Sequence, residues 1–263
     1  MKIFIMIVVA VINMIAINLS YAYESYDYKL FKPLEFKDYS VCGNISRHGL
    51  NQLYKLELIP SDISFVGKEG NVILTNCNVY IKARQLGASP QSNYDIGMNN
   101  YYNFICSTLN ALKFSKKALR SFVDPKIPEI SQLPVAIFVP PTNDEGDKLL
   151  TDSQKGITVA DYCRDNKMQC DRSGEVITIE DSEGVTRLEL VSLGDFDQDG
   201  LDDILIYFTD YGKTSTWHNY GFILLSKSTK NQKLYNMRNI YGGCVMEKNK
   251  YKCADKYQWE PKK

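Results

Sequence analysis

The sequence has no excess of charge of either sign, with 31 Lys and Arg against 31 Asp and Glu in 263 residues. This balance offers no electrostatic case for nucleic acid as a partner. The chain also has no C-x-x-C, and its two histidines are remote from any cluster of cysteines, which argues against a zinc site. It has no G-x-S-x-G around a nucleophilic serine. These absences leave no motif for nucleic-acid binding, structural zinc or α/β-hydrolase chemistry.

Long apolar runs are absent except at the start, where Ile3–Leu19 is broken only by Asn13 and Asn18. One basic residue precedes the run, and Ser20-Tyr21-Ala22 supplies small residues for cleavage. This pattern predicts a secretory signal peptide over residues 1–22. The alternative is an uncleaved membrane anchor, for which the run is short. We therefore expect a periplasmic or secreted protein with no stable membrane span after cleavage.

Seven cysteines follow this segment, at positions 42, 77, 106, 163, 170, 244 and 253. An oxidising compartment favours disulfides among them. Cys163 and Cys170 are close enough in sequence to close a small loop, and Cys244 with Cys253 could join a hairpin or tail. Of the remaining three, two are expected to pair and one to stay free, and the pairing itself cannot be deduced from sequence.

Hydrophobic periodicity predicts an α+β fold that is mainly antiparallel β-sheet with one long amphipathic helix. The helix is expected over Tyr101–Val123, where apolar residues recur at steps of three and four. Short runs of residues with a pattern typical of strands predict β-strands at 53–59, 71–74, 79–83, 135–139, 176–180, 185–193, 203–208 and 220–226. We expect loops at 85–100 and 142–148 and a short helix at 158–166.

The order of these elements suggests a division of the chain. A β-rich region at 23–124 contains the long helix, and a β-meander region occupies 135–263. Between them, prolines at 125, 128 and 134 make residues 125–134 the expected linker.

The most informative stretch is Gly194–Asp203, in which acidic residues alternate with others. Asp195, Asp197, Asp199 and Asp203 occupy positions 1, 3, 5 and 9 of a loop that runs into an apolar strand. Gly200 lets the backbone reverse, and the Leu201 carbonyl can supply a further oxygen. Such an all-oxygen shell suits Ca²⁺. An EF-hand is excluded, because its position 12 requires a bidentate Glu and here is Ile206.

Residues 188–208 resemble the calcium loop of FG-GAP repeats, as found in integrin α propellers. The resemblance implies side-chain ligands at Asp195, Asp197, Asp199 and Asp203, a main-chain ligand at Leu201, and an ion with a structural role. A propeller needs about four or more blades, and the chain has a single D-x-D-x-D-G, so a full propeller is not expected. The alternatives are a metal-free acidic turn and, least favoured, a catalytic metal.

A second candidate site is the aromatic loop that follows the strand at 203–208. Tyr211, Trp217, His218 and Tyr220 are candidates for ligand binding, because exposed aromatic residues act as rigid anchors. The alternative is a hairpin tip whose aromatic rings fold back on the sheet. Two further candidates, Ser46 with His48 and a free thiol at Cys106, lack an orienting or basic partner in sequence.

The sequence therefore predicts an exported, non-enzymatic protein with structural Ca²⁺ and a protein-binding role at the cell envelope. A periplasmic inhibitor or immunity protein would fit that size and compartment. The alternative is a calcium-dependent secreted hydrolase that acts on polysaccharide or peptide.

Overall fold

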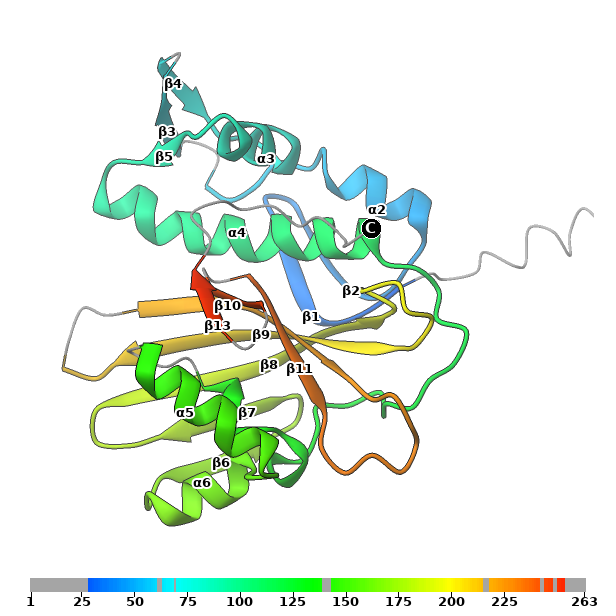
Figure 1. Ribbon diagram of the computed structural model, residues 1–263. Coiled ribbons are helices and arrows are strands. Elements are labelled where there is room, and N and C mark those ends of the chain that lie inside the picture. Colours follow the sequence, from blue (N-terminus) through cyan, green and yellow to red (C-terminus); the bar gives the residue numbers. More distant parts are fainter. Residues whose placement is uncertain are drawn as a thin grey trace, which may run out of the picture.

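The protein is described from a computed structural model that covers residues 28–60, 63–68, 70–138, 143–214, 218–241, 244–247 and 250–253. The expected signal peptide lies outside these residues. The structure has a central β-sheet with one helical layer above it and another below (Figure 1). The fold is α+β with mainly antiparallel pairing, and the described residues form neither a propeller nor a closed barrel. Among them, no helix is long and apolar enough to span a membrane.

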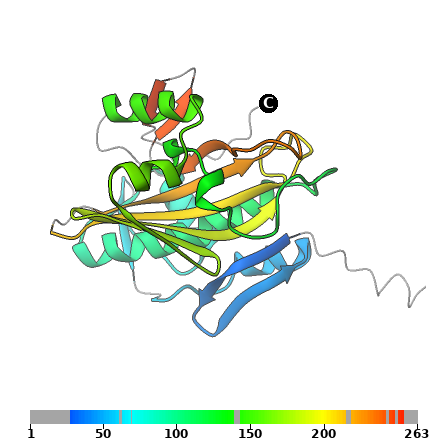
Figure 2. The ribbon, with the colours of Figure 1, turned by 90° about the horizontal axis from the view of Figure 1, so that it is seen from below.

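The central sheet has the strand order β11-β10-β9-β8-β1-β2, and the pairings between these neighbours are antiparallel. Its strands are β1 (Tyr28–Phe36), β2 (Tyr39–Ile45), β8 (Gly184–Gly194), β9 (Asp203–Gly212), β10 (His218–Ser226) and β11 (Asn236–Tyr241). The long β8 pairs near its end with β1 and near its start with β7 (Val176–Glu180), which in turn pairs with β6 (Gln169–Ser173). Seen from below, the β1–β2 hairpin (blue) and β11 (orange) lie on opposite sides of the molecule (Figure 2).

Both faces of the sheet are buried along most of β9 and β10, which explains the nearly continuous apolar sequence of these two strands. Leu205 and Tyr207 face the upper helical layer, whereas Ile204, Ile206 and Phe208 pack in the lower core. This alternation follows from the two-residue period of a strand. The strands predicted at 176–180, 185–193, 203–208 and 220–226 are thereby confirmed as β7 to β10.

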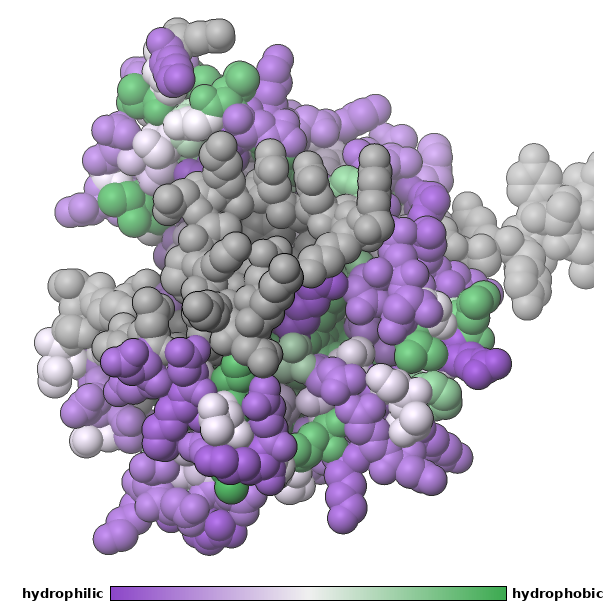
Figure 3. Space-filling view, in the orientation of Figure 1, coloured by the Kyte–Doolittle hydropathy of each residue, from purple (hydrophilic) through white to green (hydrophobic). Residues whose placement is uncertain are grey.

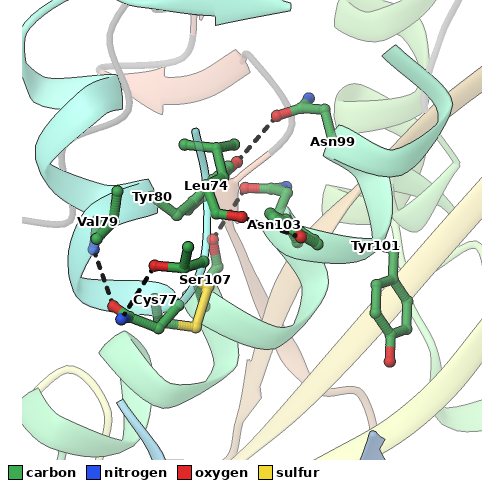
Figure 4. Close-up of a disulfide and its surroundings, with 12 residues drawn as sticks. Leu74, Cys77, Val79, Tyr80, Asn99, Tyr101, Asn103 and Ser107 are labelled. Carbon is green, nitrogen blue, oxygen red and sulfur yellow. Dashed lines mark hydrogen bonds between the residues drawn. A yellow bond between two sulfur atoms is a disulfide. The ribbon is translucent and has the colours of Figure 1, made fainter. Parts of the chain in front are cut away.

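The upper layer is built on α4 (Asn93–Phe114), whose buried face packs on the sheet. Around α4 lie α2 (Arg47–Leu53), α3 (Cys77–Gln85) and a small sheet of β3 (Ser64–Gly67), β4 (Gly70–Ile73) and β5 (Ser89–Pro90). A buried disulfide between Cys77 and Cys106 joins α3 to α4. Close to it, the Tyr80 hydroxyl donates a hydrogen bond to the Asn99 side chain at 3.1 Å (Figure 4). Of the three cysteines at 42, 77 and 106, Cys42 is therefore the one with a free thiol, and it is exposed.

The lower layer covers the opposite face with η1 (Ile130–Gln132), η2 (Val135–Ile137), α5 (Asn143–Gln154) and α6 (Val159–Asp165). Cys163 and Cys170, which the sequence indicates only as a possible pair, form a disulfide that ties the end of α6 to β6. The hairpin of β12 (Cys244–Glu247) and β13 (Lys250–Cys253) places Cys244 opposite Cys253 in the backbone register. The predicted division at residues 125–134 stays a prediction, although strands from both sides of it share the central sheet.

Three strand predictions in the helical layers are wrong. Residues 79–83 belong to α3, which begins where the Asn76 side chain accepts a hydrogen bond from the Val79 amide. Leu53 ends α2, residues 54–59 follow it without forming a strand, and 135–137 form the buried turn η2. Short apolar runs fit a strand and a buried helical turn equally well, and the tertiary contacts decide between them.

The helix boundaries also differ from the prediction. The long helix begins at Asn93 and ends at Phe114, instead of running over 101–123. Ser92 and Asp95 form a capping box at its start, which fixes the earlier beginning within the expected loop. The acidic stretch expected as a loop begins α5. Asp144 and Glu145 lie in its first turn, where their negative charges interact favourably with the helix dipole. The short helix predicted at 158–166 is confirmed as α6.

Candidate metal centre

The acidic loop connects two adjacent central strands, β8 and β9. Gly194 and Asp203 face each other across the β8–β9 ladder, so the sheet fixes both ends of the loop. Inside it, Gln198 has φ +65° and Gly200 has φ +89°, which are left-handed conformations. These two positions turn the chain tightly enough to bring its carboxylates together.

Asp195, Asp197 and Asp203 converge at one point. Each offers a carboxylate oxygen, and these oxygens all lie within 4.8 Å of one another. Asp195 is only 2% exposed and Asp203 is fully buried. Three carboxylates at this separation, two of them buried and Asp197 half-buried, form a group that could hold a metal ion.

The protein satisfies one oxygen of each buried carboxylate and leaves the other without a partner. Oδ2 of Asp203 accepts hydrogen bonds from the Phe196 amide at 2.9 Å and the Asp197 amide at 3.3 Å. Oδ2 of Asp195 accepts one from the Gly200 amide at 3.1 Å. Oδ1 of Asp195 and Oδ1 of Asp203 are buried and have no hydrogen-bond partner among the described residues. Buried polar atoms are seldom left unpaired, and a cation would supply the missing partner.

The electrostatics of the cluster point the same way. Burial raises the pKa of the Asp203 carboxyl to about 8, and the neighbouring Asp197 carboxylate adds to the effect. Burial also raises the pKa of Asp195 and of Asp197, with a smaller contribution from Asp199 in each case. Without a cation, ionising these groups together is therefore unfavourable. A divalent cation would compensate both the burial and the mutual repulsion.

Asp199 and Leu201 complete the set of ligands predicted from sequence, but they are placed differently. Asp199 is exposed, and its Oδ1 accepts a hydrogen bond from the Leu201 amide at 2.8 Å. Its carboxylate is not among the three that converge. Leu201 is half-buried. Asp202 is not among the ligands that the resemblance implies, and its amide donates to the Arg120 carbonyl at 3.0 Å.

A feature that sequence reasoning missed is the contact between the loop and residues 114–120, which begin at the last residue of α4. Lys116 and Asp195 exchange backbone hydrogen bonds of 3.0 and 3.2 Å. The Gly200 carbonyl accepts from the amides of Leu119 and Arg120. The Gln198 side chain donates to the Phe114 carbonyl at 2.8 Å. The loop is therefore attached to the upper layer as well as to the sheet, and no motif in the sequence indicates this.

The other candidate residues are not brought into one described site. Tyr211 is 40% exposed, Tyr220 is half-buried with its hydroxyl accepting from Asn99, and Trp217 lies outside the described residues. For His218 only the backbone is described, which pairs with Tyr211 in the β9–β10 ladder.

Ser46 and Cys106 have structural partners. The Ser46 hydroxyl accepts from the Gly49 amide as the cap of α2, and Cys106 is in the disulfide with Cys77.

Comparison with known proteins gives no relative: no family model, curated protein or solved structure matches this chain.

Proposed function

We propose that the chain is a non-enzymatic protein that binds Ca²⁺ in the 195–203 loop as a structural ion. The observation that carries this proposal is the pair of buried, unpartnered Oδ1 atoms of Asp195 and Asp203 in the carboxylate cluster. Ca²⁺ takes about six to eight oxygens in a flexible geometry, whereas Mg²⁺ demands a stricter octahedron. Asp197 would add a third carboxylate, and rotation of the exposed Asp199 side chain with the Leu201 carbonyl would extend the shell.

A structural role fits the surroundings of the cluster better than a catalytic one. The loop is fixed by the sheet on one side and by residues 114–120 on the other, so an ion there would hold two layers together. A catalytic metal keeps an open position for water or substrate. Full burial of Asp203 leaves little room for either.

A binding role at the cell envelope is the second part of the proposal. Two disulfides favour an oxidising, extracytoplasmic location. Half of the exposed large apolar side chains of the described residues lie between positions 66 and 96, on β3, β4, the end of α3 and the start of α4 (Figure 3). Exposed apolar groups that gather in one region favour a protein partner. An inhibitor or immunity protein against a secreted toxin would act in this way.

The alternative, a calcium-dependent hydrolase, needs a cleft with convergent polar groups. A groove of about 510 Å³ lies between β2 and α2. Its lining is mainly apolar, with Tyr39, Val41, Ile45, Leu53 and Leu56, and contains no carboxylate or histidine. Calcium-dependent cleavage of a polysaccharide or peptide, lost in Asp197→Asn, would favour the hydrolase.

The test is thermal unfolding and calorimetric titration with Ca²⁺ after treatment with chelator. At about 100 times its dissociation constant, an ion that binds only the folded state adds about 2.7 kcal/mol to the free energy of unfolding. We expect the wild type to gain several degrees and Asp197→Asn to gain none. Asp202→Asn removes the same charge from the same loop outside the cluster and should respond like the wild type. A wild type that binds no Ca²⁺ would contradict the proposal.

A further inference from the structure

The surface beside the metal centre combines bases with an exposed leucine. Lys113, Lys116, Lys117 and Arg120 are all exposed, and Leu119 is 87% exposed, the highest value among the large apolar residues described. We call these five residues the basic surface. They follow or end α4 on the side of the molecule where the 195–203 loop lies (yellow in Figure 1), and apolar and polar side chains adjoin there (Figure 3).

Within the described part of the chain, none of the four bases of this surface forms an ion pair with a carboxylate. Lys113 lies over the Tyr54 ring at 5.3 Å, which leaves its charge uncompensated. Leu119 is held beside the loop, because its amide donates to the Gly200 carbonyl at 2.9 Å. Its position therefore depends on the conformation of the loop that would hold the ion.

We propose that the basic surface docks on a bilayer of anionic lipids when the metal centre holds Ca²⁺, an inference that rests on the calcium site proposed above. Lysines attract anionic headgroups, and a projecting leucine can enter the boundary between headgroups and acyl chains. The composition favours lipid over a protein partner. Protein interfaces are depleted in Lys, and their energetic centres are enriched in Trp, Tyr and Arg rather than Leu.

The dependence on calcium follows from the backbone contact between this surface and the loop. Lys116 and Leu119 are joined to the loop by backbone hydrogen bonds, so an ion that fixes the loop also fixes the position of both residues. The loop also carries five carboxyl groups, at Asp195, Asp197, Asp199, Asp202 and Asp203. Their negative charge opposes an anionic bilayer, and a bound divalent cation offsets part of it.

The experiment is flotation of the protein, isolated after export, with vesicles in Ca²⁺ or in chelator. The vesicles are phosphatidylcholine alone, or an equal mixture of phosphatidylcholine and phosphatidylglycerol. We expect partitioning onto the mixed vesicles in Ca²⁺ only. The double variant Lys116→Glu, Lys117→Glu should lower the partition coefficient by roughly ten- to a hundredfold, and Leu119→Ala by a smaller factor.

Matched controls distinguish an effect of the basic surface from a general effect of net charge or of exposed apolar side chains. The double variant Lys230→Glu, Lys233→Glu makes the same charge change at exposed residues between β10 and β11. Leu86→Ala shortens a leucine that is 57% exposed at the end of α3. Both controls should partition like the wild type. A calcium titration by calorimetry on every variant shows whether the ion site is intact.

Each result decides between the two proposals. If Ca²⁺ binds but the wild type does not prefer anionic vesicles, the lipid inference is wrong and the calcium site stands. If no Ca²⁺ binds, the calcium site fails, and the calcium-dependent docking fails with it. Equal vesicle binding in chelator would also overturn the inference. A further result would overturn it: the protein binds soluble polyglutamate as tightly as it binds vesicles, and Leu119→Ala does not change that binding. The surface would then be assigned to an acidic polymer.

Discussion

Asp203 is the residue on which the metal centre depends most. It is fully buried, and burial raises the pKa of its carboxyl to about 8. We expect Asp203→Asn to be at least as stable as the wild type in chelator above pH 8, because the amide removes a buried charge and can still accept a backbone hydrogen bond. The same variant should lose the stabilisation by Ca²⁺, about 2.7 kcal/mol at 100 times the dissociation constant. Thermal unfolding in chelator and in Ca²⁺ measures both effects.

Asp210 provides a separate prediction of pH dependence, away from the loop. It is 7% exposed and accepts a hydrogen bond from the Thr186 hydroxyl at 3.0 Å. Burial raises the pKa of its carboxyl from 3.8 to about 6. Between these values the folded state binds a proton that the unfolded state has lost, so stability falls as pH rises from about 4 to about 6.

Asp210→Asn should remove this slope, which amounts to at most about 3 kcal/mol for a shift of two pKa units. The difference between wild type and variant, measured by chemical unfolding at each pH in Ca²⁺, isolates the contribution of Asp210. The exposed Asp171→Asn is the control and should leave the slope unchanged. A difference that is constant from pH 4 to pH 7 would contradict the prediction.

At the scale of elements, the Cys77–Cys106 disulfide joins α3 to α4 over a sequence separation of 29 residues. Loop-closure entropy predicts that removing it costs about 3 to 4 kcal/mol, against about 2 kcal/mol for Cys163–Cys170, whose separation is 7. The double variants Cys77→Ala, Cys106→Ala and Cys163→Ala, Cys170→Ala test this in urea. Equal losses, or a larger loss for the shorter loop, would mean that packing rather than loop length dominates.

At the scale of the whole molecule, the metal centre connects the sheet to the upper layer. The amides of Lys116, Leu119 and Arg120 donate to carbonyls of the acidic loop. If Ca²⁺ stabilises that loop, it must also slow local opening of residues 115–121. We expect amide hydrogen exchange in this segment to slow in Ca²⁺, whereas exchange in β3 and β4, which do not contact the loop, should be unchanged. If Ca²⁺ slowed exchange only within 195–203, the loop and residues 115–121 would open independently, which would contradict the prediction.

Local pattern was sufficient for residues 176–226, which contain the site. The meander from 176 to 226 follows from two-residue alternation, from apolar runs buried on both faces and from turn residues between them. Asp195, Asp197 and Asp203 could be grouped from spacing alone, because a tight loop between paired strands brings alternate side chains together. The helix at 158–166 was equally local and was predicted, whereas the short spacing of Cys163 and Cys170 indicated only a possible pair.

Tertiary contacts decided the rest. Residues 79–83 and 135–137 have short apolar runs that suit a strand or a helical turn, and packing against α4 or the lower core selected the helical turns. The choice of Cys106 as partner of Cys77 depends on how α3 lies on α4.

The sequence by itself thus determined the antiparallel meander and the acidic loop, since both arise from interactions between near neighbours. The placement of residues 114–120 against that loop, and with it the basic surface beside the metal centre, came only from the tertiary structure. The reason is physical: those hydrogen bonds join residues about eighty positions apart, and a period in the sequence carries no information about such a contact.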